Sequence, residues 1–191
     1  MGGEKLMCYL WEMSDDFSEK YIGEYNRDCS PDRFIFKQGE KIQNIAAKPV
    51  FNFELKKKEI LKIDCLPNNT LVPLINKKIA TLLQDVASED IQLYDAEIHT
   101  PDGIVDGYMI LNVVNTIVGL DKENSIIEYM SDGKSILGFE YLQYKEGAME
   151  TCHLARDSEY TSNLLISEYL AKLLISKKFK GLNICLPEDV W

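Results

Sequence analysis

Residues 69–118 read NTLVPLINKKIATLLQDVASEDIQLYDAEIHTPDGIVDGYMILNVVNTIV, and the predicted fold depends mainly on this stretch. Its first part places six apolar side chains on one face of a helix, namely Leu71, Ile75, Ile79, Leu82, Leu83 and Val86. Asn69 or Thr70 can cap this helix, and Pro73 falls in the first turn, where its missing N–H costs nothing. We expect the helix to cover one face of a sheet.

Strand patterns dominate the rest of the chain. Residues 91–99 and 108–118 predict a long hairpin that turns through residues 100–103. Apolar and β-branched runs between Gly and Pro predict further strands at residues 7–13, 33–37, 50–55, 59–64, 126–130, 136–143, 149–156 and 182–186. Because short turns join consecutive strands, the expected class is α+β, a largely antiparallel sheet meander with a few packed helices.

Two further helices are predicted nearer the ends of the chain. The first would follow Ser14 as N-cap, with aromatic residues at every fourth position on one face: Phe17, Tyr21 and Tyr25. The second begins near Ser167 and has Gly181 as its expected C-cap. We expect a strand and helix lobe at residues 1–66 and an α+β region at residues 67–191 within one compact unit, and we expect no internal repeat.

Charge and composition limit the classes of function. The 191 residues are 46% hydrophobic and 27% charged, which is typical of a globular protein. Acidic residues outnumber basic ones 31 to 21, which gives a net charge of −10. This balance repels phosphate backbones, so we expect no nucleic-acid partner. Acidic residues gather in residues 12–32 and 85–106, and either a solvated surface or attraction to a basic partner would account for them.

The ends and the cysteines indicate a cytoplasmic protein. Residues 1–10 lack the apolar run of a signal peptide, and no apolar stretch reaches the roughly 18 residues of a membrane span, so no membrane partner is expected. The five cysteines are widely spaced, with no Cys-x-x-Cys pair. We therefore expect free thiols and no metal site. Self-association of the chain stays open.

The sequence predicts no catalytic residue and no cofactor. Its two histidines, His99 and His153, have no motif partner, and adjacent strand positions would point Cys152 and His153 to opposite faces. Phosphate-binding, zinc-protease and nucleophile-elbow motifs do not occur in the sequence. Paired carboxylates are abundant in an acidic chain, so a two-carboxylate hydrolase stays open as an alternative, as does a non-enzymatic adaptor.

The N-terminal acidic segment is the candidate surface for a protein partner. It combines carboxylates that can steer a basic partner with aromatic side chains that can anchor it, namely Asp15, Asp16, Glu19, Tyr21 and Tyr25. Under the alternative, the aromatic residues form the buried face of a helix. Residues 85–106 would then be the better candidate.

Three stretches resemble a bacterial immunity-protein family whose members are encoded beside toxins of contact-dependent and polymorphic-toxin systems, and which is also known through a myxobacterial immunity protein. They are IQLYDAEI at residues 91–98, YMILNVV at 108–114 followed by LDKENS at 120–125, and LISE at 165–168 followed by KGL at 180–182. The family often has Phe-Arg near its penultimate strand, whereas residues 154–156 here keep Arg156 without the phenylalanine.

This resemblance implies a stoichiometric inhibitor that binds and neutralises a cognate protein toxin. It implies no catalytic machinery, which agrees with the missing motifs. Within the family signature, Asp121 and Ser125 are expected to cap a turn, because Asp and Ser side chains bond nearby backbone N–H groups; a toxin contact is the alternative.

Overall fold

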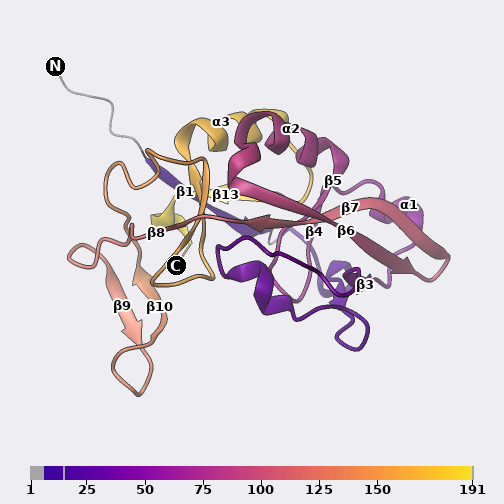
Figure 1. Cartoon of the computed structure of the whole chain (residues 1–191), viewed down its shortest axis with the longest axis horizontal. Coiled ribbons are helices and arrows are strands. Elements are labelled where there is room, and N and C mark those ends of the chain that lie inside the picture. Colours follow the sequence, from indigo (N-terminus) through magenta and orange to yellow (C-terminus); the bar gives the residue numbers. More distant parts are fainter. Residues whose placement is uncertain (1–6, 15, 191) are drawn as a thin grey trace.

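The computed structural model describes residues 7–14 and 16–190. Its strands form a five-stranded sheet, a six-stranded sheet and a separate two-stranded hairpin (Figure 1). The helices are α1 (Lys57–Ile60), α2 (Lys77–Ala87) and α3 (Glu168–Lys177), together with the 3-10 turns η1 (Glu19–Tyr21), η2 (Arg33–Lys37), η3 (Ser88–Asp90) and η4 (Pro187–Asp189). The predicted α+β class with mainly antiparallel strands is confirmed.

The six-stranded sheet is built around the predicted long hairpin. Its order is β2 (Glu24–Tyr25), β3 (Val50–Asn52), β6 (Ile91–Thr100), β7 (Gly103–Val113), β5 (Leu74–Asn76) and β4 (Cys65–Leu66). Neighbours are antiparallel except β3 and β6, which are parallel. The hairpin is tighter than predicted, because Thr100 pairs directly with Gly103 across the turn.

The five-stranded sheet joins the two ends of the chain. Its order is β13 (Leu182–Cys185), β1 (Cys8–Met13), β12 (Leu164–Ser167), β11 (Leu154–Asp157) and β8 (Thr116–Ile117). The N-terminal strand β1 therefore lies between two C-terminal strands and is antiparallel to both. The predicted strands at the two ends are confirmed, whereas their pairing was not predicted.

Both sheets contain the same unit of four strands and a helix. In the first unit the sheet order is β6-β7-β5-β4 and α2 follows β5; in the second it is β13-β1-β12-β11 and α3 follows β12. All these neighbours are antiparallel. The two segments align without a gap: LINKKIATLL (residues 74–83) corresponds residue by residue to LISEYLAKLL (residues 165–174). The expectation of no internal repeat was wrong, and β1 takes the place in the second unit that β7 has in the first.

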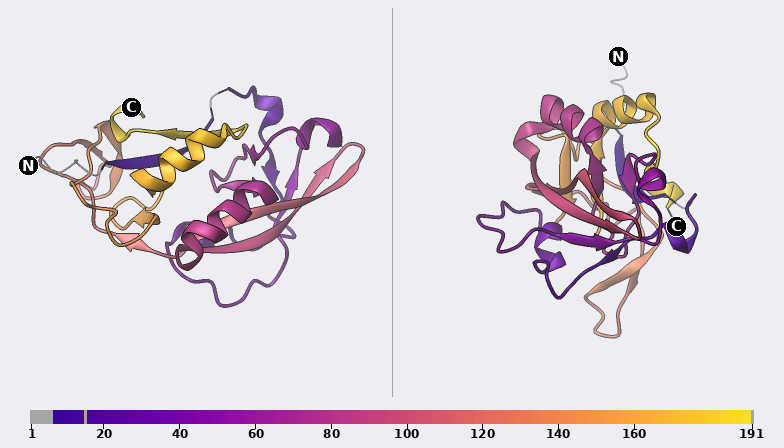
Figure 2. Two further views of the ribbon diagram at one scale, coloured as in Figure 1. Left: turned by 90° about the horizontal axis from the view of Figure 1, so that it is seen from above. Right: turned by 90° about the vertical axis from the view of Figure 1, so that its right-hand side faces the viewer.

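Three apolar clusters form the core. The central one lies between the two sheets and includes buried residues of both α2 and α3, such as Leu83 and Leu174. Figure 2 shows these two helices side by side. The second cluster covers the other face of the six-stranded sheet around Phe51 and Ile98, and the third covers the other face of the five-stranded sheet around Leu10 and Leu165.

Helix α2 begins later than predicted. Residues 74–76 form β5, and Asn76 is the N-cap, whose side-chain oxygen accepts from the N–H groups of Lys78 and Ile79. Leu74 and Ile75 satisfy the helical spacing, but they pair with β7 instead. Tertiary pairing thus overrides local helix propensity before Asn76. For α3, the predicted start is confirmed, because the Ser167 hydroxyl accepts from the Leu170 N–H.

Several shorter elements differ from the prediction. Residues 33–37 form η2, capped by Asp32, and the predicted strand at 59–64 is replaced by α1 and a turn. Helix α3 ends at Lys177, and its C-cap is Lys178, which has a φ of 53°, and not Gly181. The strand predicted at 149–156 is confined to residues 154–157, and β12 was not predicted.

Candidate functional site

The hairpin of β9 (Ile126–Tyr129) and β10 (Ile136–Tyr141) projects from the body of the protein (Figures 1 and 2). It carries five large apolar side chains that are between 37% and 57% exposed, namely Ile126, Tyr129, Met130, Leu137 and Tyr141. Aromatic residues and Met are enriched in protein interfaces, and a group of such side chains on a soluble protein marks an interaction site. Of the large exposed apolar side chains in the described residues, more lie within residues 126–141 than in any other stretch of that length.

The edges of this hairpin are available for pairing. Within residues 7–14 and 16–190, β9 and β10 pair only with each other. An unpaired strand edge presents backbone N–H and C=O groups to which a partner strand can add. Residues 121–141 contain five acidic residues and two lysines, so the projection is also negatively charged. It combines apolar anchors, free edges and a charge that favours a basic partner.

Hydrogen bonds hold the two ends of the hairpin. At its tip, the Asp132 carboxylate accepts from the Ser135 hydroxyl and from the N–H groups of Lys134 and Ser135, and these bonds, the hydroxyl one first, lower its pKa. At its base, Asp121 accepts from backbone N–H groups, and the Ser125 hydroxyl exchanges hydrogen bonds with Gln143. The turn-capping role predicted for Asp121 is confirmed, whereas Ser125 bonds the backbone of Gln143, 18 residues further along the chain, and so joins two segments instead of capping the turn. The turns are therefore ordered while the strands between them expose their apolar side chains.

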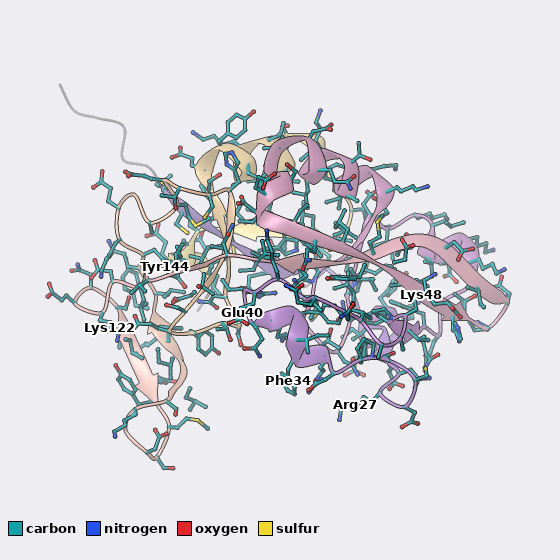
Figure 3. The ribbon with its side chains drawn as sticks, viewed as in Figure 1. Arg27, Phe34, Glu40, Lys48, Lys122 and Tyr144 are labelled. Atoms are coloured by element: carbon teal, nitrogen blue, oxygen red, sulfur yellow. The ribbon has the colours of Figure 1, made fainter. Side chains whose placement is uncertain are left out.

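An ion pair and an aromatic ring contact hold the base of the hairpin against the body of the protein. Lys122 forms an ion pair with Glu159, and the Phe139 ring packs edge-on against Tyr160 with 5.3 Å between centroids. Figure 3 shows Lys122 at this base. A partner bound to the hairpin would therefore meet a defined projection.

The N-terminal acidic segment differs from the predicted helix. It contains only η1 and β2, Asp15 lies outside the described residues, and Asp16 and Glu19 are exposed. The Tyr21 ring is half-buried against Phe17, with 5.2 Å between centroids.

Tyr25 is buried in this segment. Its hydroxyl donates to the Pro31 carbonyl oxygen at 2.7 Å, and burial raises its pKa to about 12. The side chain therefore belongs to the core and cannot present its ring as an exposed anchor. The other candidates, Asp16, Glu19 and Tyr21, stay a prediction.

The acidic stretch at residues 85–106 is not uniformly exposed. Asp90 is buried, and its carboxylate accepts from the N–H groups of His153 and Leu154 at 2.6 and 3.1 Å and from the Asn115 amide at 2.7 Å. These bonds connect the start of β6 to the five-stranded sheet. Asp90 is thus a structural residue whose role the charge pattern did not reveal.

His153 and Ser167 lie in contact but do not form a catalytic triad. The His153 Nδ1 and Ser167 Oγ are 2.8 Å apart, yet Asp90 bonds the backbone N–H of His153 and not its ring. Ser167 is buried and caps α3. Burial also raises the pKa of the adjacent Cys152 thiol, which disfavours the nucleophilic thiolate. The arrangement therefore joins elements rather than activating a nucleophile.

The second histidine, His99, lies near the end of the β6–β7 hairpin as predicted. Its Nε2 is 2.6 Å from Glu97 Oε1, and both side chains are partly exposed. Across residues 7–14 and 16–190, no group of three His, Cys, Asp or Glu side chains is arranged to hold a metal ion. None of the helices in the same residues is long and apolar enough to cross a membrane.

The protein has a cavity of about 170 Å³. One charged residue of its wall, Arg156, is fully buried. Its Nη1 donates to the carbonyl oxygens of Thr161 and Ser162 at 3.4 and 3.0 Å. Among the described residues, neither Nε nor Nη2 of Arg156 has a hydrogen-bond partner. Sequence reasoning identified Arg156 only through the family resemblance and did not predict its burial.

Two other charged residues, Lys37 and Glu12, line this cavity. Burial is the main cause that lowers the pKa of Lys37 to about 8, and the nearby Arg156 charge adds to it. Burial likewise lowers the pKa of Arg156 to about 10, against the opposing effect of the Glu12 carboxylate. The cavity therefore has a net excess of one positive charge in its wall.

Comparison with known proteins gives one family. A model described as the immunity protein family (Imm11) matches residues 8–184, which is nearly the whole chain. A search of curated proteins found no match.

Proposed function

The chain belongs to the Imm11 immunity protein family, and on this premise we propose that it binds a cognate bacterial toxin and neutralises it as a stoichiometric inhibitor. The family match over residues 8–184 is the observation that carries this proposal. The proposed inhibitor acts in the cytoplasm by occupancy and without turnover. The absence of an activated nucleophile at His153 and Ser167 supports a binding role.

We propose the β9–β10 hairpin as the main toxin contact. Tyr129, Met130 and Leu137 supply anchors that bury apolar area on association, and their exposure in the free protein means that binding does not require the core to open. Both strand edges can add backbone hydrogen bonds. The acidic surroundings favour a toxin with a basic surface.

We propose a second, electrostatic role for the N-terminal acidic segment. Asp16 and Glu19 are exposed, as a steering charge requires, and Asp15 belongs to the same stretch of sequence. Charges of this kind raise the association rate more than they slow dissociation. The two surfaces therefore predict different kinetic signatures.

The hairpin is tested by one apolar-to-polar substitution and a matched control. Leu137→Ser on β10 is expected to weaken binding to the toxin encoded beside this gene by about 30-fold, the loss typical of a hot-spot residue. Leu61→Ser makes the same chemical change at the end of α1, where the side chain is 64% exposed, against 57% for Leu137. It should leave affinity within about twofold, because scattered exposed apolar residues contribute little. Equal affinities for the two variants would discard the hairpin surface.

Steering is tested by replacing Asp15, Asp16 and Glu19 with lysine and measuring association across salt concentrations. We expect a slower association rate at low salt and a weaker dependence on salt, with dissociation nearly unchanged. An unchanged association rate in a folded variant would remove this segment from the interface. Turnover of any substrate that disappears when one carboxylate is removed would contradict the inhibitor proposal and favour the hydrolase alternative.

A further inference from the structure

Six exposed lysines gather where α2 begins and α3 ends. The two helices lie side by side (Figure 2), and Lys78 of α2 and Lys177 of α3 line the same groove. Asp64, which precedes β4, connects the neighbouring turns to this place, because its carboxylate pairs with the Lys78 Nζ at 3.2 Å and accepts from the Lys180 N–H at 2.9 Å. We call the following exposed residues the basic patch: Lys62, Lys77, Lys78, Lys177, Lys178 and Lys180.

The basic patch has the opposite charge to the rest of the protein. Asp85 lies about two turns after Lys78 on α2 and lines the same groove. Six lysines against Asp64 and Asp85 give a net charge of +4, so the rest of the chain has −14 within the total of −10. The acidic β9–β10 hairpin points to the other side of the body from α2 and α3 (Figures 1 and 2). An anionic surface would therefore attract one side of the molecule and repel the other.

Helix stability does not account for the lysines of α2. The N-terminal end of a helix has a partial positive charge, which disfavours cations in the first turn. Lys77 and Lys78 nevertheless begin α2, and the ion pair with Asp64 offsets this cost for Lys78. In the second unit of the repeat the position of Lys77 is taken by Glu168, whose charge suits the helix dipole. The lysines at the start of α2 are thus placed against the local electrostatic preference.

The residue types favour an anionic lipid surface over a protein or a nucleic acid. Arginine is enriched and lysine is depleted in protein interfaces, and all six cations of the basic patch are lysines. Apolar side chains accompany them, because Ile175 on α3 is 50% exposed and the partly buried Phe179 lines the groove. Such side chains gain little from a phosphate backbone, whereas beside lysines they can enter the headgroup region of a bilayer.

We propose that the basic patch binds the surface of an anionic lipid bilayer, with Ile175 and Phe179 entering the headgroup region. The expectation of no membrane partner rested on the missing apolar stretch, which a peripheral contact does not need. The proposal does not depend on toxin binding, because the patch and the β9–β10 hairpin are separate surfaces. A protein bound in this way turns the hairpin away from the bilayer.

Sedimentation of the full-length protein with lipid vesicles measures this binding. Vesicles of about 30% phosphatidylglycerol in phosphatidylcholine are compared with pure phosphatidylcholine vesicles at about 0.15 M salt. We expect saturable binding to the anionic vesicles that weakens as salt is raised, and at least about 20-fold weaker binding to the neutral vesicles. Equal binding to both kinds of vesicle, or to neither, would overturn the proposal.

Two variants of equal net charge test whether the basic patch carries the binding. The first variant combines three changes in the patch, namely Lys62→Gln, Lys177→Gln and Lys180→Gln. The control combines the same change at three exposed lysines outside it, namely Lys41→Gln, Lys48→Gln and Lys145→Gln. The first should bind the anionic vesicles about 100-fold more weakly, since each lysine at the surface contributes about fivefold, and the control should stay within about threefold. Equal losses would discard the patch. If the first variant fails to fold, Lys177→Gln against Lys41→Gln makes the same comparison.

A second matched pair tests the apolar contribution. Ile175→Ser should weaken binding to the anionic vesicles by about fivefold, because it removes an apolar side chain that is buried on contact. Ile104→Ser makes the same change on β7, where the side chain is 48% exposed and lies outside the patch, and it should leave binding within about twofold. Equal effects would contradict the insertion of Ile175.

Competition separates lipid from other anionic partners. Duplex DNA and polyglutamate are each added to the vesicle-bound protein at the same concentration of negative charge as the lipid. We expect the protein to stay on the vesicles, because neither polymer offers an apolar layer to the exposed side chains. Displacement by DNA would assign the patch to a nucleic acid and displacement by polyglutamate to an acidic protein, and either result would overturn the lipid proposal.

Discussion

Asp90 provides the sharpest test of how the two sheets are held together. Its buried carboxylate accepts three hydrogen bonds, two of them from backbone N–H groups at the start of β11. The change Asp90→Ala removes all three acceptor interactions at once. Hydrogen bonds to charged groups contribute about 1.5–3 kcal/mol each, and a buried donor left without acceptor costs about 1–3 kcal/mol.

The expected loss in the free energy of unfolding is about 4 kcal/mol, less than the sum of the separate bonds because the Asn115 amide also donates to the Leu154 carbonyl oxygen. For a urea slope of about 2.5 kcal/mol/M, the unfolding midpoint should fall by about 1.5 M. Asp90→Asn keeps one oxygen acceptor and should lose about half as much.

Urea unfolding followed by circular dichroism and tryptophan fluorescence measures this effect. Asp95→Ala is the matched control, because Asp95 is an exposed carboxylate on the same strand, β6. It should shift the unfolding free energy by less than about 0.5 kcal/mol. A loss below about 1 kcal/mol for Asp90→Ala would refute the structural role assigned to these bonds.

Two further predictions concern a glycine and a half-buried lysine. Gly181 and Gly107 have nearly the same φ, 89° and 91°. A Cβ added at Gly181 would lie 2.1 Å from the Cys65 carbonyl oxygen, whereas a Cβ added at Gly107 would have no atom within 4 Å. Gly181→Ala should therefore destabilise the protein by about 3 kcal/mol or more and Gly107→Ala by about 1 kcal/mol in the same urea assay, and equal losses would contradict the steric argument. Because the pKa of Lys37 is lowered from 10.5 to about 8 by burial, its charged form destabilises the folded state fully below pH 8 and progressively less up to pH 10.5. Lys37→Met should raise the free energy of unfolding at pH 7 by about 1 kcal/mol after allowance for solvent screening and lose most of this advantage by pH 10. Lys41→Met, the same change at an exposed position, is the control and should change the free energy of unfolding at pH 7 by less than about 0.5 kcal/mol.

The parts of the fold that local signals specify were predictable. Alternating residues on either side of Pro101-Asp102 predict the β6–β7 hairpin, and Ser167 before an apolar stripe predicts the start of α3. At α2 the same reasoning failed, because Leu74 and Ile75 fit both a helical face and a buried strand. Only the distant strand β7 decides between the two.

The N-terminal aromatic residues show the same limit. Phe17, Tyr21 and Tyr25 have helical spacing, but Tyr25 lies in β2, which pairs with β3, and its ring packs against Phe51 with 5.1 Å between centroids. A long-range contact thus removes one of the proposed surface anchors. The exposure of the β9–β10 hairpin could not be predicted either, because the sequence pattern of its strands is the same as that of strands in a larger sheet.

The internal repeat explains why the Arg156 cavity has no compact sequence signature. Its wall takes Glu12 from β1, Leu66 from β4, Arg156 from β11 and Leu164 from β12, so both units contribute to it. In the second unit the place of β7 is taken by β1, which comes from the opposite end of the chain. The cavity therefore requires β1 in its place between β12 and β13, and the same pairing brings Glu12 near enough to Arg156 to oppose the lowering of its pKa. Hydrophobic periodicity predicts local structure from residues that are near one another in the sequence. A site whose wall comes from both ends of the chain depends on long-range strand pairing, which periodicity does not predict.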